Sequence, residues 1–436
     1  MIRLRDFREI DFILLFVVLV VVVFGILFIY SSGFTSAGTH ISNEYRRQIV
    51  WAAAGLAIAL FLALFNYRRM YDLSVYFYLI TIALLVLTLV SGRFAHGSRW
   101  LRLGPITIQV SEFAKITTIL FLAWYLDSTK RNKKTFVRFM ISCFIVLIPM
   151  TLTLIQPDLG TALVFIPILL GMAFIAGISA RYITFLGISI VLSGIFLILP
   201  LWQTYTMDTV LPALSMLTNT RFVATSCLLL LLIALVAWIG FVRYKKNYFF
   251  WICFTAGIII FSLAASFFAH KVLREYQLMR LVVFMNPNID PRGSGWHIIQ
   301  SITAIGSGGA FGMGYLQGTH SQYHFLPEQS TDFIFSIFSE EWGFRGGILL
   351  FALFLTINLR LIRIMRITVD TFGSYIVAGL LSMYAFHFFI NVGMTMGIMP
   401  ITGIPLIFMS YGGSSLITGM IGLGFALSVH VRRYIK

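Results

Sequence analysis

Charged side chains are scarce in this sequence of 436 residues: only 11% are Asp, Glu, Lys or Arg, and 16 acidic residues stand against 32 basic ones. A soluble domain normally carries about a quarter charged residues, so the composition argues against any sizeable soluble domain. Cysteine is rare as well. Cys143, Cys227 and Cys253 each lie inside an apolar stretch without CxxC spacing, so nothing indicates a disulfide.

Apolar sequence fills the chain instead. Hydrophobic residues make up 59% of it, the mean hydropathy is +0.92, and apolar runs of about 20 residues recur, the length that crosses a ~30 Å hydrocarbon core. We therefore predict an all-α polytopic integral membrane protein, a single membrane domain over 1–436 with about twelve transmembrane helices. The predicted spans are 11–31, 49–66, 74–91, 111–127, 138–155, 160–178, 183–201, 222–242, 249–269, 332–355, 374–397 and 405–431. The first run is long for the apolar core of a secretory signal, so we expect it to be retained.

The basic residues are spread over short loops between these spans. A net charge of +16 could suggest nucleic acid, but Arg and Lys clusters on alternate loops are typical of the cytoplasmic loops of membrane proteins, so no nucleic-acid partner is expected. The alternation predicts cytoplasmic termini. It also predicts that the long polar segment 270–331 lies on the extracytoplasmic side.

Several basic residues fall on that outer side, where the positive-inside rule does not explain them. They are Arg93, Arg99 and Arg102 before the fourth predicted helix, and Lys271, Arg274, Arg280 and Arg292 in the segment 270–331. A guanidinium group matches phosphate well, so an anionic, phosphorylated ligand is one hypothesis. Solvated loop charge that balances lipid headgroups is the alternative.

An acidic turn is the strongest candidate for chemistry. Residues 326–332 (LPEQSTD) run directly into the apolar stretch 333–338, which puts Asp332 at the edge of a hydrophobic helix. A carboxylate in that place is costly and therefore more often functional than incidental. The alternative is that Thr331 or Asp332 simply caps the following helix.

Three further charged residues lie at the same predicted level. Glu112 and Lys115 are three apart, hence on one helix face, and Asp158 precedes a helix N-terminus, where the dipole favours a carboxylate. Each also has a structural interpretation: the first two could form an ion pair that holds helices together, and Asp158 could be a plain N-cap. Trp100 could be an ordinary interfacial tryptophan.

Two other patterns carry weaker signals. The glycine-rich run 306–314 lacks the ending of a nucleotide-binding P-loop, so we expect a flexible or re-entrant loop whose backbone N–H groups could meet phosphate. Histidines 270, 297, 320, 324 and 387 show no metal-ligand spacing.

Taken together, the ordered motifs resemble one known family along nearly the whole chain. They are 98–104 (SRWLRLG), 109–115 (QVSEFAK), 156–163 (QPDLGTAL), 304–309 (AIGSGG), 318–322 (GTHSQ), 325–336 (FLPEQSTDFIFS), 340–346 (EEWGFRG) and 399–415 (MPITGIPLIFMSYGGSS). The chain is similar to the SEDS family (shape, elongation, division and sporulation) of bacterial cell-wall proteins, especially its elongation members.

This resemblance implies a peptidoglycan glycosyltransferase that polymerises lipid II into glycan strands during cell elongation and shape maintenance, releasing undecaprenyl pyrophosphate. Asp332 would be the general base. The other implied site residues are Arg99, Arg102, Arg274 and Arg280 at the diphosphate, Glu112, Lys115 and Asp158 in a cavity beneath Asp332, Trp100 at the lipid II site, and Glu328 in the acidic motif. The lipid tail would need a lateral groove beside the outer loop.

The resemblance also implies the setting. A divalent cation, Mg or Mn, could assist at the diphosphate, and no organic cofactor is expected. Implied partners are lipid II, membrane lipids, a class B penicillin-binding protein acting as transpeptidase, and the elongation proteins MreC and MreD. The implied location is the bacterial cytoplasmic membrane, with both termini cytoplasmic and the segment 270–331 as an extracytoplasmic catalytic loop.

Departures from the family pattern leave alternatives open. Val110, Ser330 and Ile407 replace a usual proline, histidine and proline, and the segment 202–248 looks like an insertion around an extra helical pair beyond the usual ten spans. A flippase or transporter of lipid-linked precursors, a division polymerase like FtsW, or a scaffold would each use parts of the same sequence. The charged motifs gather on one predicted side, which favours a catalyst over a two-sided transporter.

Overall fold

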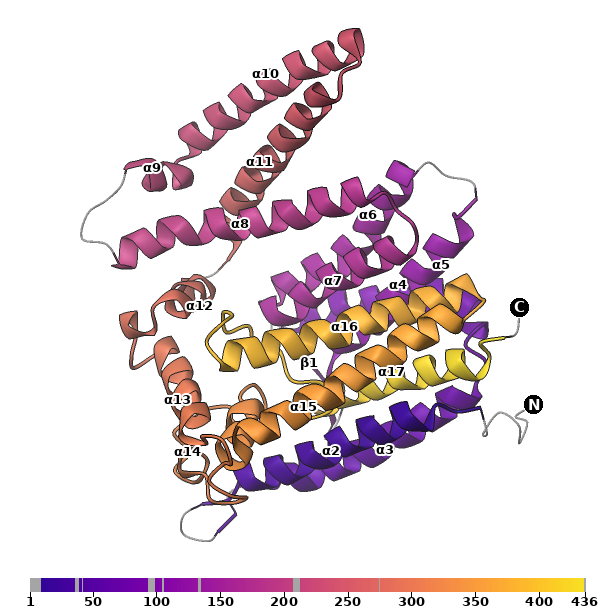
Figure 1. Ribbon diagram of the computed structural model, residues 1–436, viewed down its shortest axis with the longest axis vertical. Coiled ribbons are helices and arrows are strands. Elements are labelled where there is room, and N and C mark those ends of the chain that lie inside the picture. Colours follow the sequence, from indigo (N-terminus) through magenta and orange to yellow (C-terminus); the bar gives the residue numbers. More distant parts are fainter. Residues whose placement is uncertain are drawn as a thin grey trace. The chain divides into compact units, whose positions relative to one another are not determined.

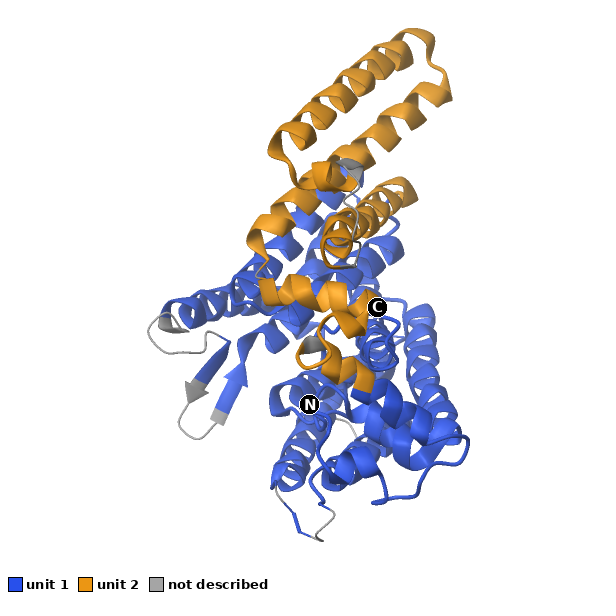
Figure 2. Ribbon diagram, turned by 90° about the vertical axis from the view of Figure 1, so that its left-hand side faces the viewer, with its two compact units in different colours: residues 1–178, 300–436 blue, residues 179–299 orange. Residues whose placement is uncertain are grey.

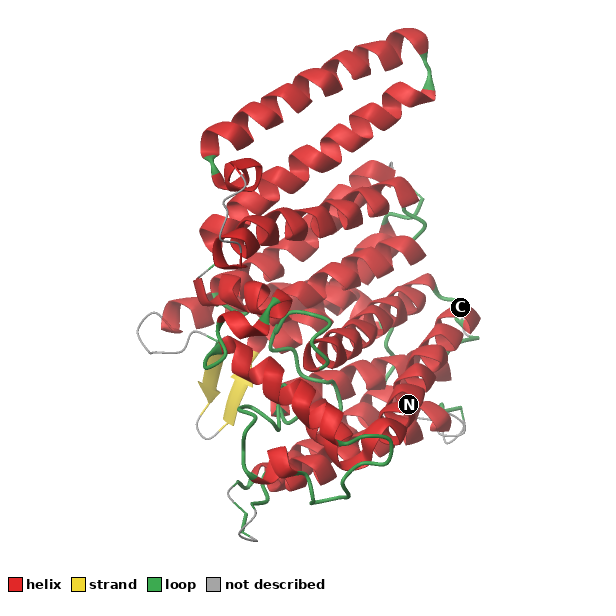
Figure 3. Cartoon of the chain, turned by 60° about the vertical axis from the view of Figure 1, so that its left-hand side comes forward, coloured by secondary structure: helices red, strands yellow, loops and turns green. Residues whose placement is uncertain are grey.

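The computed structural model describes residues 9–35, 39–40, 42–92, 99–103, 106–131, 135–206, 212–273 and 275–434. Most of these residues are helical (Figure 3). A small antiparallel hairpin interrupts the helices, in which strand β1 (Trp100–Leu103) pairs with strand β2 (Ile106–Gln109) directly before the next helix. The prediction of an all-α membrane fold is confirmed.

Twelve long helices in the described part of the chain overlap the twelve predicted spans. They are α2 (Phe12–Ser32), α3 (Glu44–Leu64), α4 (Arg69–Gly92), α5 (Val110–Ser128), α6 (Thr135–Ile155), α7 (Leu159–Ile175), α8 (Ala180–Thr206), α10 (Thr220–Tyr244), α11 (Asn247–Val272), α15 (Ile334–Ile367), α16 (Thr371–Thr395) and α17 (Gly413–Val431). Ten of them are long and apolar enough to cross a membrane by themselves. The other two are α7, which has 17 residues, and α5, which carries Glu112, Lys115 and Asp127.

The chain folds into two compact units (Figure 2). Unit 1 comprises residues 1–178 and 300–436, and unit 2 comprises residues 179–299. Unit 2 holds α8, the short helix α9 (Pro212–Ser215), α10, α11, α12 (Glu275–Met285) and the start of α13 (Ser294–Ser307). Within it α10 packs against α11, and α11 packs against α8. Large apolar side chains on α10, among them Leu231, Leu235 and Trp238, are exposed, as expected for a surface that faces lipid.

Helix α16 forms the core of unit 1. It packs against α5, α7, α15 and α17 (Figure 1), and most of its residues are buried. Small residues permit this close packing: a Cβ at Gly379 would lie 2.8 Å from Ile119 of α5, and a Cβ at Gly171 would collide with Ser382. Polar side chains on α16 are therefore held inside the protein, away from lipid.

Helix α15 is broken at Gly343, whose φ of 65° and ψ of −162° are not helical. The glycine-rich loop that follows α13 closes the break. Backbone N–H groups of Met313 and Gly314 donate to the carbonyls of Glu340 and Glu341 at 3.0 Å, while Phe344 N–H donates to Gly309 O at 2.9 Å. Broken helices survive at membrane depth only when such groups are satisfied by protein.

The same bonds correct one expectation from the sequence. The backbone N–H groups of Gly312, Met313 and Gly314 donate to carbonyl groups of the protein, so these three amides are not available to a phosphate. Close approach explains the glycines: a Cβ on Gly308 would lie 2.1 Å from Ser339 O.

Candidate functional site

Asp332 lies in the turn that leads into α15. Its side chain is half-buried, its backbone N–H donates to Glu328 O at 3.1 Å, and its carbonyl accepts a hydrogen bond from Asn391 Nδ2 at 2.9 Å. The N-cap position of α15 is occupied by Phe333. Neither Thr331 nor Asp332 is the N-cap residue of this helix, so the N-cap position alone does not account for the Asp332 carboxylate.

The segment 402–405, between α16 and α17, lies directly beside this carboxylate. Gly403 adopts a left-handed conformation with φ of 71°, and a Cβ on it would lie 3.3 Å from Asp332 Oδ2. The same loop is tied to the acidic turn further on, where Tyr411 N–H donates to Ser330 O at 2.8 Å. This arrangement places the backbone of a glycine, which has no side chain, next to Asp332 Oδ2.

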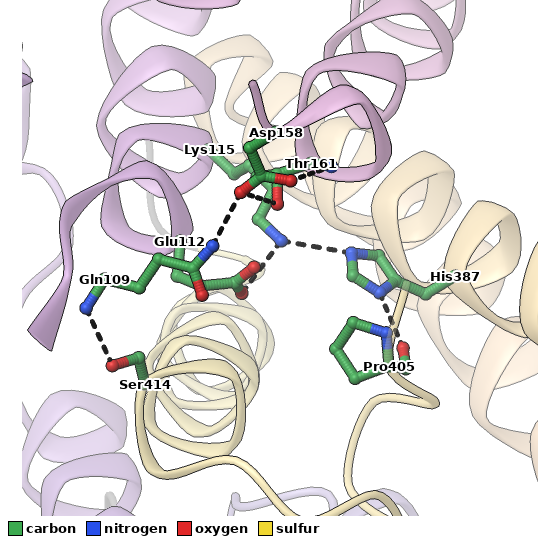
Figure 4. A network of polar contacts seen from close by, with 8 residues as sticks. All are labelled: Gln109, Glu112, Lys115, Asp158, Thr161, His387, Pro405 and Ser414. Atoms are coloured by element: carbon green, nitrogen blue, oxygen red, sulfur yellow. Dashed lines mark hydrogen bonds and ion pairs between the residues drawn. The ribbon is translucent and has the colours of Figure 1, made fainter. Parts of the chain in front are cut away.

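A buried polar network reaches the segment 402–405 at Pro405 (Figure 4). Lys115 Nζ donates to Glu112 Oε2 at 2.8 Å and contacts His387 Nε2 at 3.1 Å, and His387 Nδ1 lies 3.0 Å from Pro405 O. A carbonyl only accepts, so Nδ1 carries the imidazole hydrogen and Nε2 accepts from the ammonium group. His387 is thus held as a neutral imidazole between Lys115 and the loop.

Asp158 joins a second branch of polar contacts (Figure 4). It is the N-cap of α7, accepting from Thr161 N at 3.2 Å and from Thr161 Oγ1 at 2.9 Å. Its Oδ2 also accepts from Gln109 Nε2 at 2.6 Å, and Gln109 N–H donates to Ser414 Oγ at 3.1 Å. The N-cap interpretation is confirmed, yet Asp158 does more than cap because it links α7 to the start of α5.

The segment 402–405 connects these groups with Asp332. A Cβ on Gly160, in the first turn of α7, would lie 2.4 Å from Thr402 O. Successive residues of the segment therefore lie close to α7, the Asp332 carboxylate, Asn391 and His387. The structure brings the predicted residues Glu112, Lys115 and Asp158 into one region of unit 1 with Asp332.

Arg99 and Trp100 lie at the start of the small hairpin. The Arg99 guanidinium donates to Gln156 O at 3.1 Å and also to Pro157 O, so it holds the turn before α7. Trp100, on β1, is 49% exposed. Arg102 pairs with Thr107 in the hairpin, and its side chain lies outside the described residues.

The remaining predicted residues are Arg280, Glu328 and Arg274. Arg280 lies on α12 in unit 2, half-buried, with its guanidinium 5.8 Å from the centre of the Tyr276 ring. Glu328 is exposed and accepts from Thr331 Oγ1 at 3.2 Å. Arg274 lies outside the described residues.

Sequence reasoning alone misses two buried glutamates, although both lie in the motif 340–346 (EEWGFRG). Glu340, fully buried on α15, accepts from His320 N at 2.9 Å and from Ser321 N at 3.3 Å. Glu341 accepts from Leu316 N at 3.2 Å and from Ser31 Oγ. The two carboxylates therefore anchor the loop that precedes the acidic turn.

A tyrosine in that loop is fixed by the same surroundings. Burial, together with the negative charge of Glu341, raises the pKa of Tyr315 to about 12. The phenol therefore keeps its hydrogen and donates it to Leu27 O at 3.0 Å.

A mostly apolar groove of about 590 Å³ runs along α15. Phe335, Ser339, Gly347 and Phe351 line it from α15, and Met396 lines it from the end of α16. A Cβ on Gly347 would meet nothing within 4 Å. The groove begins three residues after Asp332, which matches the expectation of a groove beside the outer loop.

Among the described residues, no group of three or more His, Cys, Asp or Glu side chains is placed to hold a metal ion. Mg²⁺, however, is often bound by one or two carboxylates plus phosphate oxygens of a substrate. Glu328 and Asp332, in one turn, offer carboxylates of that kind.

Fold and site together define a class: a multi-pass membrane protein that keeps paired charges buried among its helices, next to a half-buried aspartate at a helix start. The chain belongs to the SEDS family. The family model of FtsW, RodA and SpoVE, described as cell cycle protein, matches residues 11–222 and 204–435.

Individual relatives extend over the full length. The chain is 46% identical to the peptidoglycan glycosyltransferase RodA of Treponema pallidum, over 99% of this chain and 100% of that protein. It is 31% identical to the peptidoglycan glycosyltransferase MrdB of Escherichia coli, over 98% of this chain and 95% of that protein. A solved chain from a peptidoglycan synthase complex that coordinates polymerization and crosslinking superposes with a TM-score of 0.65 and 26% identity, covering 98% of this chain and 99% of that one.

Proposed function

We propose that this chain is a peptidoglycan glycosyltransferase that polymerises lipid II into glycan strands during cell elongation, with Asp332 as general base. The observation that carries the assignment is the Asp332 carboxylate, half-buried at the start of α15 and faced by Gly403 with no side chain between. The family relationship and the names of the full-length relatives support the reaction class.

The chemistry needs two kinds of help. A base must take the proton of the acceptor sugar hydroxyl as that oxygen attacks the donor sugar, and positive charge must stabilise the departing undecaprenyl pyrophosphate. Asp332 is suited to the first task because the residue is only half-buried while its main chain is held at both N–H and carbonyl. For the second task the family resemblance proposes Arg102, Arg274 and Arg280, because the Arg99 guanidinium already donates to two carbonyl groups.

A divalent cation is proposed to share the second task. Glu328 and Asp332 would hold it together with the diphosphate of the substrate, in the manner that Mg²⁺ favours. When bound, it would neutralise charge on the leaving group.

The buried network has a supporting role in this scheme. Lys115 is neutralised by Glu112 and hydrogen-bonded to His387, so its charge is paired in place, as buried membrane charges usually are. The network thus holds the segment 402–405 at Pro405, and Gly403 of that segment lies beside Asp332.

The groove along α15 is proposed to receive part of the lipid tail of the substrate. It is mostly apolar, its lining on α15 starts at Phe335, three residues after Asp332, and it has a volume in the ~300–1,000 Å³ range typical of small-molecule sites. A tail bound there would leave the diphosphate and sugar near the acidic turn.

The setting of the reaction is proposed on the same basis. The chain would lie in the bacterial cytoplasmic membrane with both termini cytoplasmic and the segment 270–331 outside, as the distribution of Arg and Lys predicts. A class B penicillin-binding protein would crosslink the strands, within a complex that includes MreC and MreD. The solved peptidoglycan synthase complex supports a crosslinking partner.

The test is polymerisation of labelled lipid II by the purified chain, with its cognate penicillin-binding protein disabled in its own active site. Wild type is compared with Asp332→Asn, and with Asp72→Asn as a matched control, because Asp72 is an exposed carboxylate in the first turn of α4. We expect glycan ladders from wild type and Asp72→Asn and none from Asp332→Asn, with all three folded.

Two other results would be decisive. Full-length ladders from Asp332→Asn would show that Asp332 is not the general base, although the chain would still be a polymerase. Absence of ladders from wild type, together with lipid II translocation in proteoliposomes, would show that the chain is a transporter and not a polymerase.

A further inference from the structure

Asn391 is the residue that joins the acidic turn to the segment 402–405. Its side chain is fully buried on α16, and its Nδ2 donates to Asp332 O at 2.9 Å and to Ile404 O at 2.8 Å. An amide NH₂ has two hydrogens, so both are used on two main-chain carbonyls far apart in the sequence. This fixes which way the amide points.

The carbonyl oxygen of the same amide makes no hydrogen bond to a described residue. Asn391 Oδ1 is buried without a hydrogen-bond partner among the described residues, and an unsatisfied buried acceptor costs stability. The residue therefore contributes less to stability than an amide with all of its hydrogen bonds made. What it does provide is a fixed distance between the Asp332 main chain and the loop opposite.

A neighbouring residue on α16 holds the same loop. His387, four residues earlier and hence on the same helix face, contacts Pro405 O at 3.0 Å through Nδ1. Two consecutive carbonyls, those of Ile404 and Pro405, are thus held by one face of a buried helix. The loop backbone cannot shift past α16 without breaking both contacts.

The position of the Asp332 main chain depends on these contacts more than the position of a residue inside a helix would. Asp332 precedes the first residue of α15, so the helix ladder does not fix it. The backbone bonds described for it are its N–H to Glu328 O and its carbonyl from Asn391. Gly403, held in the loop, then sets the space beside Oδ2, because any Cβ there would lie 3.3 Å away.

We propose that Asn391 is a positioning residue for the general base: by tying Asp332 O to Ile404 O, it fixes where the Asp332 carboxylate lies relative to Gly403 and the bound acceptor. The inference rests on the proposed function. Misplacement of a catalytic group by about 1 Å costs on the order of 100-fold in rate. Loss of Asn391 therefore lowers kcat and leaves substrate binding largely unchanged.

The first variant is Asn391→Asp, which keeps the shape of the side chain and replaces both donor hydrogens by an acceptor facing two carbonyls. The matched control is Asn358→Asp on α15, where the amide Nδ2 donates to Phe354 O at 2.8 Å within one helix. For both, kcat and KM are measured with labelled lipid II, rates are normalised to the folded fraction, and the unfolding temperature in detergent is recorded.

We expect kcat of Asn391→Asp to fall roughly 100-fold with KM within about threefold, whereas Asn358→Asp keeps kcat within about twofold of wild type. Wild-type kcat in Asn391→Asp would overturn the inference while leaving the polymerase intact. So would a raised KM at unchanged kcat, or a rate loss equal to the loss of folded protein.

A second variant keeps the inference testable if Asn391→Asp does not fold. Gly403→Ala leaves the Asn391 amide in place and introduces a methyl group beside Asp332 Oδ2, at a position whose φ of 71° is also unfavourable for alanine. We expect the same pattern of lowered kcat and preserved KM. A Gly403→Ala protein with wild-type kcat would contradict the inference by itself.

Discussion

Lys115 Nζ lies 2.8 Å from Glu112 Oε2, and both side chains are buried in the interior of unit 1. An exposed pair of this kind contributes little to stability. A buried pair behaves differently, because removal of one partner leaves an uncompensated charge in a medium of low dielectric constant.

The first prediction concerns this pair. Glu112→Gln or Lys115→Met alone should each lower the free energy of unfolding by about 3–5 kcal/mol, while the double variant should cost clearly less than the sum. The measurement is a double-mutant cycle of unfolding in detergent. Glu9→Gln, which removes the partly exposed Arg433 pair, serves as the control and should cost about 0–1 kcal/mol. Strict additivity at Glu112 and Lys115 would mean that the pair is not coupled.

Part of this site is visible in the sequence because it is local. Spacing alone places Glu112 and Lys115 on one helix face, and the residue before a helix start predicts the capping role of Asp158. The apolar runs likewise predict all twelve long helices, since each span must satisfy its backbone internally.

The contacts that complete the site are not local and leave no pattern. Asn391 and Asp332 are 59 residues apart, and Lys115 and His387 are 272 apart. A single asparagine or histidine inside an apolar helix does not indicate which loop it will meet. The break in α15 also escaped prediction, because its hydrogen bonds are completed by a loop from earlier in the chain.

Arg99 illustrates the same limit and gives the second prediction. Its guanidinium donates to the carbonyls of Gln156 and Pro157, so Arg99→Ala should cost about 1.5–3 kcal/mol of stability with little change in KM for lipid II. Arg102→Ala, in strand β1 of the small hairpin, should change stability by less than about 0.5 kcal/mol and raise KM. Unfolding and steady-state kinetics of the two variants are compared side by side.

Arg99→Lys separates the two roles of Arg99 further. Lysine keeps the positive charge but lacks the planar fork that reaches two carbonyls. Stability should therefore fall in Arg99→Lys as well. A variant with wild-type stability and a changed KM would assign Arg99 to the diphosphate after all.

The groove along α15 gives the third prediction. A Cβ on Gly347 points into open space, so Gly347→Leu should fold and fill part of the groove. Loss of contact with about two methylene groups of the tail, ~1.6 kcal/mol, corresponds to roughly a tenfold higher KM for long-tailed lipid II. A lipid II analogue with a short tail should be affected much less.

Gly187→Leu is the control for that experiment, since Gly187 on α8 also has nothing within 4 Å of its Cβ position and does not line the groove. Its KM for long-tailed lipid II should match that of wild type. Equal effects of Gly347→Leu on long-tailed and short-tailed substrates would argue that the groove does not receive the tail.

The fourth prediction concerns the divalent cation. The described residues contain no group of three or more potential metal ligands, so a cation would be bound mainly through the diphosphate of the substrate, with Glu328 and Asp332 as protein ligands. EDTA should therefore stop polymerisation, and added Mg²⁺ or Mn²⁺ should restore it. The unfolding temperature of the substrate-free protein should not change with EDTA, because a ligand stabilises a fold only when it binds that fold. A fall in unfolding temperature with EDTA would instead indicate a metal ion bound to the substrate-free protein. Undiminished polymerisation in EDTA would mean that the arginines alone stabilise the departing pyrophosphate.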